Sequence, residues 1–224
     1  MQTSLSHAAP SFAPGLVPNQ GIPQPRPELS IRVLHTPEER QEIAHLRRHA
    51  DFRSEYELDP GIASLEAVKD SLGIVMGVVL GDDVIATIRI IPTGHGVTLT
   101  ERFWRDLVTQ PEIFANTSWE VGRLVMDPDF RRADLLPRCM SMALVKLLEV
   151  VEVRHLHASC LTSMTRLYRR FGMSTHAVRS KAGKDCALIH GDVTEVCAAL
   201  KVQVPSRSRH AVRQHAVAEA QLLQ

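Results

Sequence analysis

The segment 119–151 constrains the fold more than any other part of the sequence. The apolar, β-branched run Trp119–Met126 is typical of a buried strand, and Asp127-Pro128-Asp129 closes it with a turn. Apolar pairs then recur with a period of four from Leu135 to Val151, which predicts a helix with one buried face. Pro137 is tolerated there because it falls in the first turn. A strand followed by such a helix indicates a sheet that is covered by helices.

The remaining periodic segments complete this prediction. The residues from Thr36 onward carry a helix start signal, an N-cap followed by proline and two acids, and that helix is expected to reach Arg48 or Phe52. A second helix is expected over Ser163–Phe171, ended by Gly172. An irregular helical insert is expected near 98–115. Further strands are expected at Ser30–His35, Gly73–Leu80, Val84–Pro92, His155–Cys160, Met173–Val178 and Cys186–Gly191. The order β-α-β-β-β-α-β-α-β-β predicts an α/β (α+β) protein with a mixed central sheet flanked by helices.

The chain is expected to hold one domain with two extensions. Residues 1–29 carry six of the thirteen prolines and almost no charge, which indicates a flexible leader. Residues 30–201 form the continuous pattern of strands and helices. Residues 202–224 form a basic tail with apolar residues at loosely helical spacing, which favours a surface helix.

Composition excludes several classes of protein. The 224 residues have a formal net charge of +1, so no long-range field is available to hold a nucleic acid. The apolar run Ser71–Gly81 is much shorter than the about 20 residues that cross a bilayer, so no membrane span is expected. The four cysteines show no C-x-x-C pair, and no secretory signal precedes the domain, which favours a cytoplasmic location.

Other chemical motifs are weak. His155 and His157 alternate on one strand without a further ligand cluster, so no metal site is expected. Ser159 and Cys160 lack a nucleophile elbow, which disfavours covalent catalysis. The Gly94-His95-Gly96 sequence does not open a βαβ unit, so no dinucleotide site is predicted.

The segment Met164-Thr165-Arg166-Leu167-Tyr168-Arg169-Arg170-Phe171-Gly172-Met173 is more informative. It reads as a helix that ends at glycine and leads directly into a strand. It resembles the helix–strand turn of the GCN5-related N-acetyltransferase (GNAT) superfamily, and the order of elements over about 30–192 agrees with that fold. The resemblance implies an acyltransferase in which the Tyr168 hydroxyl protonates the departing thiolate.

A second resemblance is carried by residue types at fixed spacing, namely Arg48, Phe52, Arg89, Phe103, Glu120 and Arg123. This set is similar to that of the acyl-homoserine-lactone synthases and the long-chain N-acyl amino acid synthases. The resemblance implies that Glu120 accepts the proton of the attacking amine and that the other five residues, with Asp70, bind substrate. The lactone synthases have tryptophan where this chain has Leu58, and a second acid where it has Gly73. These departures argue against S-adenosylmethionine and favour an amino acid or related amine.

The resemblance also implies an acyl donor site. Backbone amides of the strand at Leu124, Val125 and Met126 would hold the thioester. The next turn contains Arg131 and Arg132 but lacks the glycines that bind a pyrophosphate in acetyltransferases. This favours acyl carrier protein, with its phosphopantetheine thioester, over acyl-CoA as the donor. No bound cofactor is expected.

Alternatives remain open at this point. The chain could be a lactone synthase that uses S-adenosylmethionine, or a non-catalytic module that binds acyl carrier protein. Glu120 could form a structural ion pair with Arg89 or Arg123, and Tyr168 could simply fill space beneath the sheet. Arg48 and Phe52 could be ordinary helix surface and core, and the Arg131 turn a solvated helix start.

Overall fold

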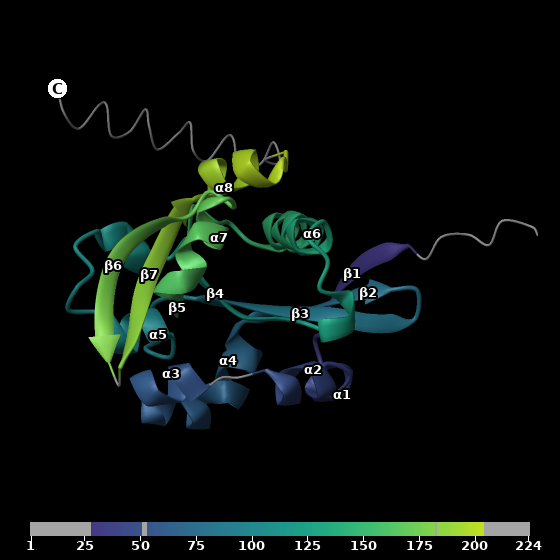
Figure 1. The fold of residues 1–224 in the computed structure, drawn as a ribbon, viewed down its shortest axis with the longest axis horizontal. Helices are drawn as coiled ribbons and strands as arrows, with labels where there is room; N and C mark the ends of the chain where they lie inside the picture. Colours follow the sequence, from purple (N-terminus) through teal and green to yellow (C-terminus); the bar gives the residue numbers. More distant parts are fainter. Residues whose placement is uncertain (1–27, 51–52, 182, 204–224) are drawn as a thin grey trace, which may run out of the picture.

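A single twisted sheet of seven strands organises the protein (Figure 1). The computed structural model describes residues 28–50, 53–181 and 183–203. The strand order is β1-β2-β3-β4-β5-β7-β6, and every neighbouring pair is antiparallel except β4 and β5. The strands are β1 (Leu29–Val33), β2 (Ile74–Leu80), β3 (Asp83–Pro92), β4 (Ser118–Met126), β5 (His155–Leu161), β6 (Ser174–Lys181) and β7 (Lys184–Asp192).

Helices cover both faces of this sheet. On one side lie α6 (Leu135–Val150), α7 (Thr165–Arg169) and α8 (Val193–Leu200), at the top of Figure 1. On the other side lie α1 (Pro37–Gln41), α2 (Ala44–His49), α3 (Arg53–Leu58) and α4 (Glu66–Leu72), with α5 (Leu99–Phe103) near the β5 end. Single 3₁₀ turns, η1 to η4, occur at Pro60–Leu65, Pro111–Phe114, Pro128–Phe130 and Thr162–Met164.

Helix α6 is the main support of the sheet, as its sequence pattern predicts. The apolar residues on one face of the helix, from Leu135 to Leu148, are buried, and most of them join the largest core cluster, which includes Met76, Trp119 and Ile189. This burial explains why the helix is the longest element in the described chain, since packing of the apolar face supplies most helical stability.

Strands β4 and β5 diverge after a short pairing, and the gap between them is called the split here. They pair only from Ser118 opposite His155 to Glu120 opposite His157. Beyond that point β4 pairs with β3 alone, and its register shifts so that Arg123 and Leu124 together oppose Ile88. Arg123 has φ of 51°, an uncommon value for a residue other than glycine. The split and this bulge therefore leave one edge of β4 unpaired in the middle of the sheet.

Most of the predicted elements are confirmed. The mixed sheet and its strands are present, and Thr36 caps α1 through a capping box with Glu39. The helix expected from Thr36 to Arg48 or Phe52 is instead divided into α1 and α2. Helices α3, α4 and α8 were not predicted.

Most of the N-terminal leader and of the C-terminal tail lies outside the described residues. Leu29 belongs to β1, opposite Leu80, rather than to the leader, while the rest of that segment up to residue 27 and the tail from residue 204 lie outside the described residues. In the described part of the chain, no helix has the length and apolar character needed to cross a membrane.

Candidate active site

Glu120 lies at the closed end of the split, where β4 and β5 last pair. Its side chain is buried and accepts hydrogen bonds from the first residues of α5: from the Leu99 amide at 3.1 Å, and from the Thr100 amide and hydroxyl at 2.7 Å each. Burial raises the pKa of Glu120, while these hydrogen bonds and the charge of Lys69 oppose the rise. The expected structural partners, Arg89 and Arg123, pair with other carboxylates instead.

A cluster of opposite charges lies between helices α2 to α4 and the sheet, and is called the charged cluster here. Its members are Arg47, Glu55, Glu66, Lys69, Asp70, Arg89 and Arg123. Glu66 is its centre. It accepts from Arg89 Nη1 and from Arg123 Nε, both at 3.0 Å, so that one carboxylate from α4 ties β3 to β4.

The other two carboxylates complete these pairs. Asp70 accepts from Arg89 Nη1 at 2.8 Å and from Arg47 Nη1 at 2.5 Å. Glu55 of α3 accepts from Arg123 Nη1 at 2.7 Å. Because Arg123 occupies the strained position of the β4 bulge, its two carboxylate partners hold the backbone at the split in place.

The arginines of the cluster favour the ionised forms of Glu66 and Asp70. Burial alone would raise the pKa values of Glu66 and Asp70, but hydrogen bonds from the arginines hold both below their usual range. Lys69 is buried on α4, and its loss of solvation lowers its pKa, against the charges of Glu120 and Glu66. Glu120 is thus electrically linked to the cluster through Lys69.

Gly73 explains one departure from the lactone synthase pattern. A Cβ atom built on this residue would lie 2.9 Å from the carbonyl oxygens of Ile90 and Lys69, so no acidic side chain fits at this position. The second carboxylate of α4 comes from Glu66, one turn before Asp70, and both point to Arg89. In this chain Glu66, rather than a residue at position 73, is therefore the second acid beside Arg89.

Tyr168 lies on the opposite side of the sheet, on α7. Burial raises the pKa of its phenol to about 12, with smaller contributions from Cys160 of β5 and Glu55 of α3. Its ring packs against the main core cluster and meets Phe171 edge-on, with 6.3 Å between the ring centres. The phenol keeps its proton at neutral pH and can donate it.

His157 is a buried neighbour of Glu120 on β5. Its Nδ1 is 3.1 Å from the Ser118 hydroxyl, and burial, followed by the nearby His190 and His155, lowers its pKa to about 3. A group with such a pKa is a weak proton acceptor at neutral pH. Among the described residues no group of His, Cys, Asp and Glu side chains has the arrangement of a metal site.

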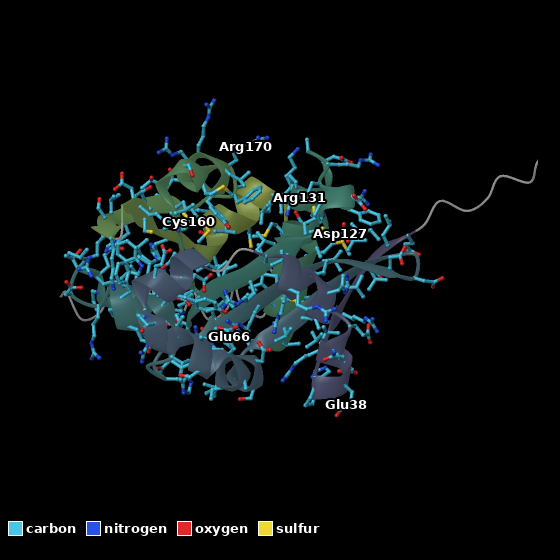
Figure 2. All side chains as sticks on the ribbon, turned by 60° about the horizontal axis from the view of Figure 1, so that its bottom comes forward. Glu38, Glu66, Asp127, Arg131, Cys160 and Arg170 are labelled. Carbon is cyan, nitrogen blue, oxygen red and sulfur yellow. The ribbon has the colours of Figure 1, made fainter. Side chains whose placement is uncertain are left out.

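Exposed arginines surround the other side of the split, and they are called the basic rim here. They come from the turn after β4, from α6, and from α7 with the residue that follows it: Arg131, Arg132, Arg138, Arg166, Arg169 and Arg170. Figure 2 shows Arg131 and Arg170 on the same upper side of the molecule. Arg132 is 3.5 Å from Asp134, and both are largely exposed; in the described chain the other five form no ion pair.

The other predicted residues are distributed as follows. Arg48 is exposed, and its neighbour Arg47 contacts Asp70 instead. Phe52 lies outside the described residues. Phe103 is buried at the end of α5, where it lines a pocket. Sequence reasoning missed Glu55, Glu66, Lys69 and Arg47; the spacing of Glu66 and Asp70, one helical turn apart, is the signal that could have found α4.

Comparison with known proteins identifies the family. The family described as N-acyl amino acid synthase FeeM matches residues 42–184, which is more than half of the chain. The chain belongs to this family. As an N-acyl amino acid synthase it is an acyltransferase that transfers an acyl chain to an amino acid. Among the functions that the sequence left open, this result selects the amino acid acceptor. Curated protein sequences give no match.

Solved structures confirm the GNAT fold of this N-acyl amino acid synthase. The structure of FeeM, an N-acyl amino acid synthase from uncultured soil microbes, is similar with a TM-score of 0.60 and 19% identity, over 77% of this chain and 95% of that chain. The CoA-dependent acyl-homoserine lactone synthase BjaI gives 0.55 and 13%, over 79% and 90%. The acyl-homoserine-lactone synthase LasI gives 0.52 and 13%, over 80% and 98%.

Proposed function

We propose that this synthase takes its acyl chain from acyl carrier protein, and that the phosphopantetheine arm enters the split from the side of α6 and α7. The observation that carries this proposal is the basic rim, whose exposed arginines come from the elements on both sides of the split. A carrier protein is acidic, so its surface complements these charges.

The turn after β4 supports a carrier protein rather than CoA. The amides of Arg131, Arg132 and Leu135 donate within the turn itself, to Pro128, Phe130 and Arg132. Those amides are not available to a pyrophosphate, which CoA carries and phosphopantetheine lacks. A single phosphate requires fewer donors, and the rim arginines suit it.

The acyl transfer follows as direct attack. The free edge of β4 offers alternate backbone amides, those of Leu124 and Met126, to the thioester carbonyl, whose oxygen gains negative charge in the transition state. The Val125 amide faces β3 instead, because Asp127 two residues later donates to Ile85 of β3. The amine of the amino acid attacks the carbonyl carbon and the carbon–sulfur bond breaks. Glu120 accepts the amine proton, directly or through water, and Tyr168 donates its proton to the thiolate.

The charged cluster has a positioning role in this scheme. Arg123 belongs to the β4 bulge, and Glu66 and Glu55 fix its guanidinium. Arg89 binds Glu66 in turn, and Asp70 binds Arg89. We infer that these residues line the acceptor side and orient the β4 amides before substrate binds.

Charge reversal at the rim tests the donor. In the double variant Arg131→Glu/Arg132→Glu, kcat/KM with acyl carrier protein should fall about tenfold or more at low salt, and less at high salt, because salt screens exposed charges. An acyl-pantetheine analogue should be affected little. The control is Arg105→Glu, an exposed arginine after α5. Equal losses with both donors would contradict docking of a carrier protein at the rim. Turnover with acyl-CoA but not with acyl carrier protein would show that acyl-CoA is the donor.

A further inference from the structure

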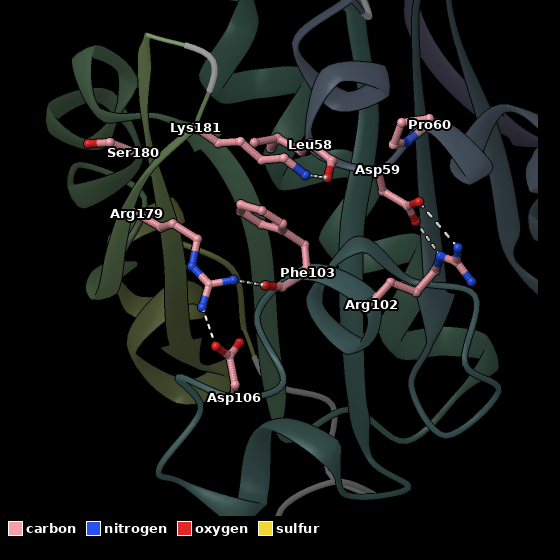
Figure 3. A pocket seen from close by; sticks show the side chains of 9 residues that line it. All are labelled: Leu58, Asp59, Pro60, Arg102, Phe103, Asp106, Arg179, Ser180 and Lys181. Atoms are coloured by element: carbon pink, nitrogen blue, oxygen red, sulfur yellow. Dashed lines mark hydrogen bonds and ion pairs between the residues drawn. The ribbon is translucent and has the colours of Figure 1, made fainter.

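A pocket on the acceptor side has no role in the mechanism above. It has a volume of about 650 Å³ and lies between the end of α3, helix α5 and strand β6 (Figure 3). The apolar side chains of Leu58 and Phe103 form part of its wall. This size is in the range of pockets that bind small molecules.

The pocket has a surplus of positive charge. Arg102 pairs with Asp59 and Arg179 pairs with Asp106, so two of its three cations are balanced (Figure 3). The third, Lys181, donates to the carbonyl oxygen of Leu58 at 2.6 Å, and its ammonium lies 5.3 Å from the centre of the Phe103 ring. Within the described residues Lys181 forms no ion pair with a carboxylate.

Helix α5 links the pocket to the split. Its first turn binds Glu120 through Leu99 and Thr100, and its last residue is Phe103. Three residues of helix rise about 4.5 Å, so the pocket wall begins roughly one turn from the proposed proton acceptor. An amino acid whose amine is at the split can therefore place its side chain, rather than its α-carboxylate, in this pocket.

We propose that this pocket binds the side chain of the acceptor and that Lys181 gives the enzyme a preference for an anionic side chain. The inference rests on the proposed function, because it takes the acceptor side of the split from it. The methylene groups of a long acidic side chain would contact Leu58 and Phe103, and its carboxylate would meet the Lys181 ammonium.

Glutamate and glutamine test the preference, because they have nearly the same shape and differ in charge. With the native enzyme, kcat/KM should be about tenfold higher for glutamate, as expected for one charge-assisted hydrogen bond. In Lys181→Met this ratio should fall to about one, and in Lys181→Glu it should fall below one while lysine becomes the better acceptor. Since both acceptors are measured on the same enzyme, loss of folded protein cancels from the ratio.

A neighbouring lysine provides the matched control. Lys184 also connects the β6–β7 hairpin to α3, through Glu57 at 2.9 Å, but it does not line the pocket. Lys184→Met should keep the native ratio. Equal losses for both acceptors in Lys181→Met would overturn the proposal and leave Lys181 as a structural link or a partner of the α-carboxylate. If acyl carrier protein donates to neither acceptor while another acyl thioester does, the proposed function itself fails, which is a different result.

Discussion

The two sides of the split differ in how their charges are satisfied. On the acceptor side, the charged cluster combines buried cations, such as Arg89 and Arg123, with half-buried carboxylates. Glu66 is shared between these two arginines. On the donor side, the basic rim is exposed and only Arg132 has an acidic partner in the described chain. The same residue type, arginine, thus serves two purposes in one protein.

This difference follows from solvation. A buried guanidinium without a carboxylate loses its hydration and gains nothing in return, so the cluster is stable only as a complete set. An exposed guanidinium keeps its water and costs little when it is alone. We infer that the acceptor side is organised before the reaction, whereas the donor side is completed by its partner.

The largest effect is expected at Glu120, which links the split to the cluster. In Glu120→Gln the rate of acyl transfer should fall about 10²–10⁴-fold, the usual contribution of a positioned base. The loss should shrink as pH rises, because more of the amine then arrives already deprotonated. Turnover measured against pH, together with thermal unfolding of the same preparation, checks this prediction.

Thr100→Val is the control for Glu120. It removes one of the donors to the carboxylate and leaves the carboxylate in place. If Glu120 only supports α5, both variants should lose activity in proportion to their loss of stability, with no change in the pH profile. That outcome would assign the deprotonation to bound water.

Glu66 should show the largest effect on stability. Glu66→Gln leaves Arg89 and Arg123 without their common carboxylate, and breaking a buried ion pair in this way costs about 3–5 kcal/mol. Glu42→Gln, which breaks an exposed pair with Arg32, should cost about 1 kcal/mol or less. Denaturant unfolding gives the free energy of unfolding of both variants. Similar losses would show that the ion pairs of Glu66 stabilise the protein no more than an exposed pair does.

The pH dependence of this stability has a definite sign. The pKa of Glu66 is lowered in the folded state, so its contribution is present above its unfolded pKa of about 4.3 and is lost as pH falls through the folded value. The stability difference between the native protein and Glu66→Gln should therefore be constant near pH 7 and shrink below about pH 4. A difference that persists in acid would point to packing rather than charge.

The fold was largely predictable because its signals are local. The four-residue period of α6 and the capping sequence at Thr36 each depend on neighbouring residues, and both are confirmed. Helix α4 escaped prediction because its buried side chain is charged, Lys69. Helix α3 is only six residues long, and Leu58 is the one buried side chain described in it, which is too little for a periodic pattern. Hydrophobic periodicity does not detect a helix whose inner face is held by ion pairs.

The sequence indicated several residues of the candidate site but not which side chains contact one another. Arg89, Asp70 and Arg123 lie together, yet Glu66, the common partner of the two arginines, was missed. Arg47, not Arg48, faces the cluster. Which of two adjacent arginines points inward depends on where α2 begins, and this boundary is a tertiary feature that sequence spacing does not fix.

The smallest effects should come from the part of the basic rim that α7 provides. Arg166→Ala and Arg169→Ala remove exposed side chains that have no ion pair in the described chain, so each should change the free energy of unfolding by about 0.5 kcal/mol or less. Each should still lower kcat/KM for acyl carrier protein a few-fold at low salt, and the loss should disappear near 0.5 M salt, where the Debye length is only about 4 Å. A clear loss of stability would mean that these arginines hold α7 rather than a partner, and the contrast between the two sides of the split would then fail.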